Sequence, residues 1–207
     1  IRAGKERAEI LLAEVNHRVA NSLALVAALI RLQVSSHEDE AVKAALSETQ
    51  ARIQAIASMH RSLYSSDDVR QVEMDRYIST LAAELAESMA KDRRKSNIVC
   101  KVEPISIPSD RAVSVGMIVT ELLTNAIKYA YPGEKDGEIR VELTRVSDER
   151  ALLVVEDDGE GFDPGGPIQG TGLGTRVIAS MAKTIGGGMR YVPRARGTRA
   201  EVELDLR

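Results

Sequence analysis

The first 65 residues contain no proline and no glycine other than Gly4, so nothing in this stretch interrupts a helix. Apolar residues recur there every three or four positions, which is the period of one helix face. The first run consists of Leu12, Val15, Val19, Leu23, Val26 and Ile30, and the second of Val42, Leu46, Thr49, Ile53, Ile56, His60 and Leu63. Between them, Ser36 followed by Asp39 resembles a capping box, which starts a helix. The sequence therefore predicts two long helices joined by a short turn.

This predicted hairpin carries more apolar surface than one partner helix can cover, because Leu11, Leu25 and Leu29 flank the first run. Pairing of two hairpins into a four-helix bundle would bury the excess, and we therefore expect a homodimer. A monomer is the alternative, in which the hairpin covers its apolar run with the following domain of its own chain. We assign the hairpin to residues 1–68.

Residues 69–207 form the second predicted domain, in which strand and helix signals alternate. Its boundary lies near 66–74, where the apolar pattern gives way to polar residues. Helices are expected over 77–90, over 109–130 after the cap Pro108-Ser109-Asp110, and over 173–185. Strands are expected over 98–102, 139–144, 152–156, 189–192 and 200–206. The predicted fold class is α+β, with a helical hairpin followed by an α/β sandwich that contains a mixed sheet.

The composition excludes some classes of function. A net charge of −3 gives the chain no electrostatic affinity for nucleic acid, so we expect no nucleic-acid partner. Cys100 is the single cysteine, which rules out an intramolecular disulfide and favours the cytoplasm. No uninterrupted run of 18 apolar residues exists, so we expect no membrane span here. Because the chain starts at Ile1 rather than Met, we interpret it as part of a longer protein, and the membrane association of the whole stays open.

Two segments of the second domain suit the two ends of a nucleotide. Within Glu121–Tyr129, Glu121, Asn125 and Lys128 share one helix face, and their carboxylate, amide oxygen and ammonium suit hydrated Mg²⁺ beside phosphate. A solvated polar stripe is the alternative. Within Val155–Gly161, acidic residues end an apolar strand before glycines. An Asp there can accept a hydrogen bond from an exocyclic amine such as that of adenine, and glycines let the backbone approach a flat ligand. An ordinary turn is the alternative.

A third segment, residues 170–174, reads Gly-Thr-Gly-Leu-Gly directly before a predicted helix, whose free backbone N–H groups can bind phosphate. In this order the three segments resemble the N, G1 and G2 boxes of the GHKL ATPases, the superfamily of histidine kinases, gyrases, Hsp90 and MutL. The resemblance implies a Bergerat-type fold that binds ATP and Mg²⁺, with Asn125 on the metal, Glu121 assisting it, Lys128 near phosphate and Asp157 on adenine. The other residues that it implies for nucleotide binding are Tyr129, Gly159, Gly161, Gly170, Gly172, Leu173, Gly174 and Thr198, with residues 160–172 as a mobile lid.

The three histidines occupy different environments in the predicted hairpin. His60 lies on the apolar run of the second helix and is interpreted as a core or flanking residue. His37 lies in the polar turn and is expected to be solvated. His17 lies about 200° around the helix from Val15, and the residues one turn before and after it are small alanines. We therefore expect His17 to be accessible to a large partner.

The segment Glu14–Leu23 resembles the H box of a histidine-kinase class in which Arg-Val-x-Asn follows the phosphorylated His, a class related to the HWE kinases. The segments His60–Tyr64 and Lys128–Gly133 resemble the same class. Two HWE features, a His in the N box and Trp-x-Glu, are not evident, which favours the sister class, the second HisKA-type class. The resemblance implies a sensor histidine kinase core that autophosphorylates His17 from Mg·ATP and passes the phosphoryl group to an Asp of a response-regulator receiver domain.

One departure from the commonest histidine kinases concerns the base, because Arg18 stands where those kinases have an acidic residue after the phosphorylated His. Either Glu14, one turn earlier, acts as the base, or the imidazole needs no strong base. The candidate catalytic residues are therefore His17, Glu14 and Glu121, in a cytoplasmic catalytic portion. The alternatives are an ATP-independent histidine phosphotransferase, a phosphatase-biased member of the same class, and a serine kinase of the anti-sigma type.

Overall fold

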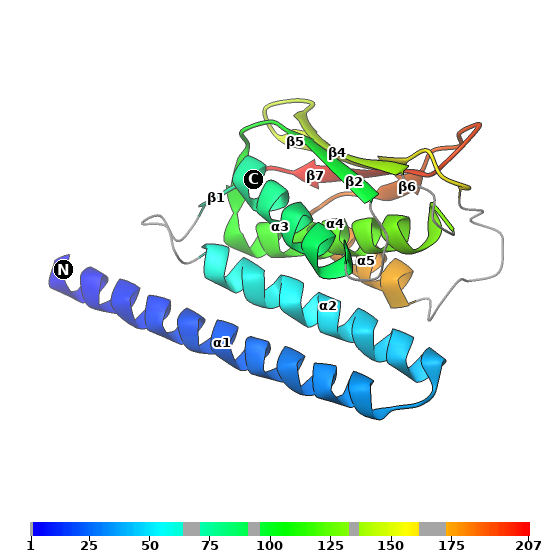
Figure 1. Cartoon of the computed structure of the whole chain (residues 1–207). Helices are drawn as coiled ribbons and strands as arrows, with labels where there is room; N and C mark the ends of the chain where they lie inside the picture. Colours follow the sequence, from blue (N-terminus) through cyan, green and yellow to red (C-terminus); the bar gives the residue numbers. More distant parts are fainter. Residues whose placement is uncertain (1, 64–70, 91–95, 133–136, 162–172) are drawn as a thin grey trace. The chain divides into compact units, whose positions relative to one another are not determined.

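The computed structural model describes residues 2–63, 71–90, 96–132, 137–161 and 173–207 (Figure 1). The chain divides into two compact units, Ile1–Gln71 and Val72–Arg207. The first unit is helical, and the second combines helices with a sheet.

The first unit is the predicted helical hairpin, made of α1 (Arg2–Ser36) and α2 (Glu40–Leu63) lying side by side (Figure 1). The predicted capping box at Ser36 is wrong. Ser36 is the last residue of α1, and its hydroxyl donates to the Gln33 carbonyl at 2.9 Å. Asp39 caps α2 instead, since its carboxylate accepts the Val42 N–H at 3.3 Å.

The fully buried side chains that the structure describes in this hairpin are small. Ala20, Ala27 and Ala57 are buried, while the larger Leu25, Leu29 and Leu32 remain more than half exposed. Val15, Val19 and Val26 of the predicted apolar run are exposed as well. Among the hairpin side chains that the structure describes, the exposed apolar ones lie mostly on α1, with Val42 of α2 exposed as well.

One stretch of α1, Val19–Ser36, is long and apolar enough to cross a membrane, with a mean hydropathy of 1.4. A count of uninterrupted apolar residues predicts no such stretch, because Asn21, Ser22 and Arg31 interrupt it. Length and composition alone do not identify a membrane span, since core helices outside membranes share both.

The second unit is built on a five-stranded sheet with the strand order β2-β4-β5-β7-β6. The strands are β2 (Ser96–Val102), β4 (Gly137–Arg145), β5 (Arg150–Asp157), β6 (Met189–Tyr191) and β7 (Arg199–Asp205). The pair β2–β4 is parallel and the other pairs are antiparallel, so the predicted mixed sheet is confirmed. A separate two-stranded sheet, β1 (Gln71–Glu73) with β3 (Ser106–Pro108), was not predicted, because three residues are too few to show a period.

Three helices, α3 (Met74–Ala90), α4 (Ser109–Tyr129) and α5 (Leu173–Thr184), cover one face of the sheet (Figure 1). The core between the layers contains Ile118 and Leu123 of α4, Ile139 and Leu143 of β4, and Ile178 of α5, all fully buried. This two-layer arrangement confirms the predicted α/β sandwich. The predicted cap of α4 is wrong in detail, since Pro108 occupies the N-cap position and no side chain caps the helix.

Candidate functional site

Asp157 ends β5, and its side chain is 3% exposed. Its Oδ1 accepts two backbone N–H groups, from Gly159 at 2.9 Å and from Thr198 at 3.2 Å. The Asp157 N–H in turn donates to the Thr198 carbonyl at 2.9 Å. Among the residues that the structure describes, no donor reaches the second carboxylate oxygen, Oδ2. A buried carboxylate is thus fixed through one oxygen and keeps the other for a hydrogen-bond donor.

Two glycines allow this close arrangement. Gly197 has φ +73°, and a Cβ there would collide with the Asp157 carbonyl. Gly159 is buried against Ala130 at the end of α4, where a Cβ would collide with the Ala130 carbonyl. The Glu160 N–H donates to that same carbonyl at 2.9 Å. The Asp157–Gly161 turn therefore touches both the start of β7 and the C-terminal end of α4.

The predicted metal-binding face lies on α4, as the spacing requires. Glu121 is 2% exposed, Asn125 and Lys128 are half-buried, and Tyr129 is exposed. The neighbouring Thr124 hydroxyl is buried, and within the described part of the chain it has no hydrogen-bond partner. A buried polar atom without a partner fits a surface completed by a polar ligand or by water. Oxygen-bearing side chains beside it suit Mg²⁺, which binds few protein oxygens and keeps its waters.

Several predicted site residues lie at the limits of the described chain. Gly170, Gly172 and nearly all of the predicted lid lie outside the described residues. Leu173 begins α5 and Gly174 is buried in its first turn, so a helix N-terminus does follow the glycines. His17 and Glu14 lie in α1, but their side chains are outside the described part. Their roles stay predictions, as do those of all the residues named above.

The ion pairs around the Asp157 turn were not predicted from the sequence. Arg140 of β4 contacts both oxygens of the Asp158 carboxylate, at 2.9 and 2.8 Å, and also Glu156 at 2.8 Å. Arg194 donates to the Asp157 carbonyl at 3.2 Å. Hydrogen bonds from Arg140 lower the pKa of Asp158. The cross-strand register could have suggested one pair, since Arg140 lies opposite Glu156.

The pKa of Glu156 is shifted by opposing effects. Burial raises it, but hydrogen bonds from Arg199 and Arg140 outweigh burial, so the net shift is downward. Glu156 and Asp158 are each paired with arginine side chains, so neither is an unpaired negative charge beside the turn.

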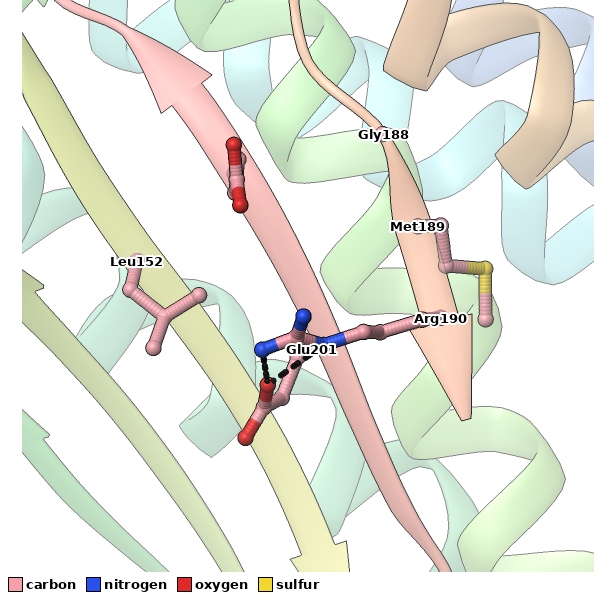
Figure 2. A pocket seen from close by; sticks show the side chains of 6 residues that line it. Leu152, Gly188, Met189, Arg190 and Glu201 are labelled. Carbon is pink, nitrogen blue, oxygen red and sulfur yellow. Dashed lines mark hydrogen bonds and ion pairs between the residues drawn. The ribbon is translucent and has the colours of Figure 1, made fainter. Parts of the chain in front are cut away.

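A shallow hollow of about 230 Å³ lies elsewhere on the sheet (Figure 2). Its lining residues are Leu152, Gly188, Met189, Arg190, Glu201 and Glu203. Arg190 and Glu201 form an ion pair of 2.7 Å across it (Figure 2). None of the predicted site residues lines this hollow, so the candidate site rests on Asp157 and its surroundings.

Two family models match the chain. One described as histidine kinase covers residues 14–89, and one described as histidine kinase-, DNA gyrase B- and HSP90-like ATPase covers residues 110–207. The chain is 33% identical over 172 residues to the sensor histidine kinase PdtaS of Mycobacterium tuberculosis, which covers 81% of this chain. It is 25% identical over 201 residues to blue-light-activated histidine kinase 2 of Erythrobacter litoralis, which covers 94% of this chain. The chain spans only 33% and 57% of the lengths of these two relatives.

Among solved structures, the chain is similar to the histidine kinase domain of the Erythrobacter litoralis EL346 blue-light-activated histidine kinase. The TM-score is 0.67 at 22% sequence identity, and the likeness covers 97% of this chain and 96% of that one. At this identity the likeness establishes the fold, a helical hairpin followed by an α/β domain.

Proposed function

The chain belongs to the histidine kinases and carries the catalytic core of that family, with an ATPase domain that implies nucleotide binding, and on this premise we propose that it autophosphorylates His17 from Mg·ATP. The observation that carries the proposal is the Asp157 carboxylate, buried, fixed by two backbone N–H groups and left with one oxygen for a donor. The exocyclic amine of adenine is such a donor. Guanine and the pyrimidine-2,4-diones place a carbonyl at the corresponding position, which Oδ2 would repel.

The nucleotide would lie between the Asp157 turn and α4. Gly159, Gly161 and Thr198 would shape the adenine end, and the segment around Gly170, Gly172, Leu173 and Gly174 would close over the phosphates. On α4, Asn125 would hold Mg²⁺ with Glu121 close to the metal or its water, while Lys128 and Tyr129 would flank the phosphates. When bound, Mg²⁺ would neutralise charge on the phosphate oxygens.

In the proposed reaction a neutral imidazole nitrogen of His17 attacks the γ-phosphorus in line. A nitrogen–phosphorus bond forms, the bond between the γ-phosphorus and the bridging oxygen breaks, and ADP leaves with that oxygen. The proton lost from the imidazole passes to Glu14 or to water. Positioning and electrostatics supply most of the catalysis in phosphoryl transfer, so Lys128 on the phosphates matters more than a strong base does.

We propose two partners for this core, which would act in the cytoplasm, where ATP is available. The first is the receiver domain of a response regulator, whose aspartate takes the phosphoryl group from the labile phosphohistidine. The second is another copy of this chain, because the exposed Leu25, Leu29 and Leu32 of α1 are apolar surface that a four-helix bundle would bury. Sedimentation equilibrium tests the dimer, and a monomer at all concentrations would favour the alternative arrangement.

The test of the proposed function is incubation with γ-labelled ATP and Mg²⁺, followed by separate acid and alkali treatments. Wild type should carry acid-labile, alkali-stable label, and His17→Ala should carry none. His37→Ala is the matched control, because His37 is exposed in the turn between α1 and α2 and should label like wild type. Label that persists in His17→Ala would refute the assignment of His17. Acid-stable label would indicate the serine kinase, and the absence of both label and ATP binding would indicate the phosphotransferase.

A further inference from the structure

Tyr131 lies two residues beyond the end of α4, and its side chain is 8% exposed. Its hydroxyl donates to the Glu138 carbonyl of β4 at 2.7 Å and accepts the Asp158 N–H at 3.0 Å. The ring occupies the space beside Gly137 in which a Cβ would collide with it. One side chain therefore joins the end of α4, the start of β4 and the turn that carries Asp157.

The preceding residue holds the same turn. The Ala130 carbonyl accepts the Glu160 N–H at 2.9 Å, and Gly159 is packed against Ala130. The backbone N–H groups of Asp158 and Glu160 thus both donate to the dipeptide Ala130-Tyr131 that follows α4. Since these hydrogen bonds involve backbone groups, they fix the path of the turn and not only its side chains.

The other hydrogen bonds of the turn lead to different parts of the unit. Thr198 at the start of β7 holds the Asp157 backbone and carboxylate, Arg140 of β4 holds the Asp158 carboxylate, and Arg194 holds the Asp157 carbonyl. The hydrogen bonds at Ala130 and Tyr131 tie the turn to the end of α4. This dipeptide therefore helps to hold Asp157 in place relative to the face of α4 that carries Asn125 and Lys128.

The tyrosine hydroxyl suits this position for a chemical reason. It must donate to a carbonyl and accept from an N–H at once, which a hydroxyl does and which phenylalanine, of nearly the same shape, cannot do. Burial raises the pKa of Tyr131, so the hydroxyl keeps its proton for the Glu138 carbonyl. The rise is in the direction expected of a neutral, hydrogen-bonded phenol.

We propose that Tyr131 is a positioning residue whose hydroxyl sets the distance between Asp157 and the phosphate-binding face of α4, so that one nucleotide reaches both. This inference rests on the proposed nucleotide site. It predicts that loss of the hydroxyl weakens the binding of a ligand that spans both ends, while the turnover of bound ATP is unchanged. If Tyr131 had only a structural role, its replacement by phenylalanine would lower thermal stability and leave nucleotide affinity unchanged.

The test compares Tyr131→Phe with Tyr191→Phe, a half-buried tyrosine on β6 at the far edge of the sheet, in the whole chain. Calorimetry with Mg·ADP should give a dissociation constant roughly three- to tenfold higher for Tyr131→Phe, the effect of one lost hydrogen bond, and a KM for ATP raised by the same factor at constant kcat. Tyr191→Phe should stay within about twofold of wild type. Amide hydrogen exchange of residues 157–161 without nucleotide should accelerate in Tyr131→Phe alone.

Two results would overturn the inference. One is wild-type nucleotide affinity in Tyr131→Phe, even if its melting temperature falls. The other is unchanged amide exchange in the turn. If wild type itself binds no nucleotide, the proposed function fails, and the exchange measurement by itself still decides whether Tyr131 holds the Asp157 turn.

Discussion

Replacement of Asp157 by asparagine should weaken the preference of the site for adenine without unfolding the protein. In the native turn Oδ1 accepts the N–H groups of Gly159 and Thr198. The asparagine oxygen can take over both hydrogen bonds, and this fixes the orientation of the amide, because the flipped amide would point its NH₂ group at two N–H donors. The NH₂ group must then occupy the position of Oδ2. The variant therefore keeps the turn but presents a donor where the native carboxylate presents an acceptor.

The magnitude follows from the hydrogen bond that is lost. A hydrogen bond to a charged group contributes about 1.5–3 kcal/mol, so Mg·ADP should bind roughly 10- to 150-fold more weakly. A ligand with hypoxanthine in place of adenine carries a carbonyl instead of the amine, and the new NH₂ group can donate to it. The ratio of adenine-nucleotide affinity to hypoxanthine-nucleotide affinity should therefore fall well below its wild-type value.

The assay is calorimetric titration of wild type and Asp157→Asn with Mg·ADP and Mg·IDP, with thermal melting of both proteins as the check on folding. Asp148→Asn is the matched control, because it makes the same chemical change at an exposed position in the turn between β4 and β5. It should bind both nucleotides like wild type. An Asp157→Asn protein that is folded and keeps the wild-type preference for adenine would refute the reasoning.

Two further predictions concern stability. Gly197→Ala should lower the free energy of unfolding by about 1–3 kcal/mol, because the added Cβ would meet a backbone carbonyl and the residue has φ +73°. Gly188→Ala is the control, because the space around Gly188 is open, and it should change the free energy of unfolding by less than about 0.5 kcal/mol. Urea denaturation measures both. The pKa values of Glu156 and Asp158 are lowered from 4.5 and 3.8, so their pairing stabilises the fold fully above about pH 4.5 and is lost as the pH falls through the lowered values. Arg140→Gln should therefore lose less stability than wild type between pH 5 and pH 2, by the same denaturation assay, and an equal or larger loss would contradict this.

The sequence by itself predicted the elements that have a strong local period. The apolar runs before residue 65 predicted α1 and α2, and the alternation of strands and helices predicted the mixed sheet with helices packed on it. The Asp157-x-Gly159 pattern at a strand end identified the candidate site, because an acid before glycines at a strand end is a local signal. Strands too short to show a period, such as β1 and β3, could not be predicted from the sequence.

Within the hairpin, periodicity identified an apolar face but not what covers it. A helical period reports which residues share a face of their own helix, and the size of the side chains decides which of them fit against a neighbouring helix. Ala20 and Ala27 of α1 are buried, while the larger Leu25, Leu29 and Leu32 remain exposed. The sequence predicted the excess apolar surface, and the structure shows on which side chains it lies.

Tertiary structure alone decided what surrounds Asp157. Thr198 is 41 residues from Asp157 along the chain and Tyr131 is 27 residues from Asp158, yet each meets the turn through a hydrogen bond between a backbone N–H and a side-chain oxygen. Such contacts depend on strand register and on where a helix ends in space, which no local pattern encodes. The sequence therefore determined which carboxylate to examine. The fold determined that one of its oxygens is held, that the other is left for a donor, and that a tyrosine ties its turn to the helix expected to carry the metal.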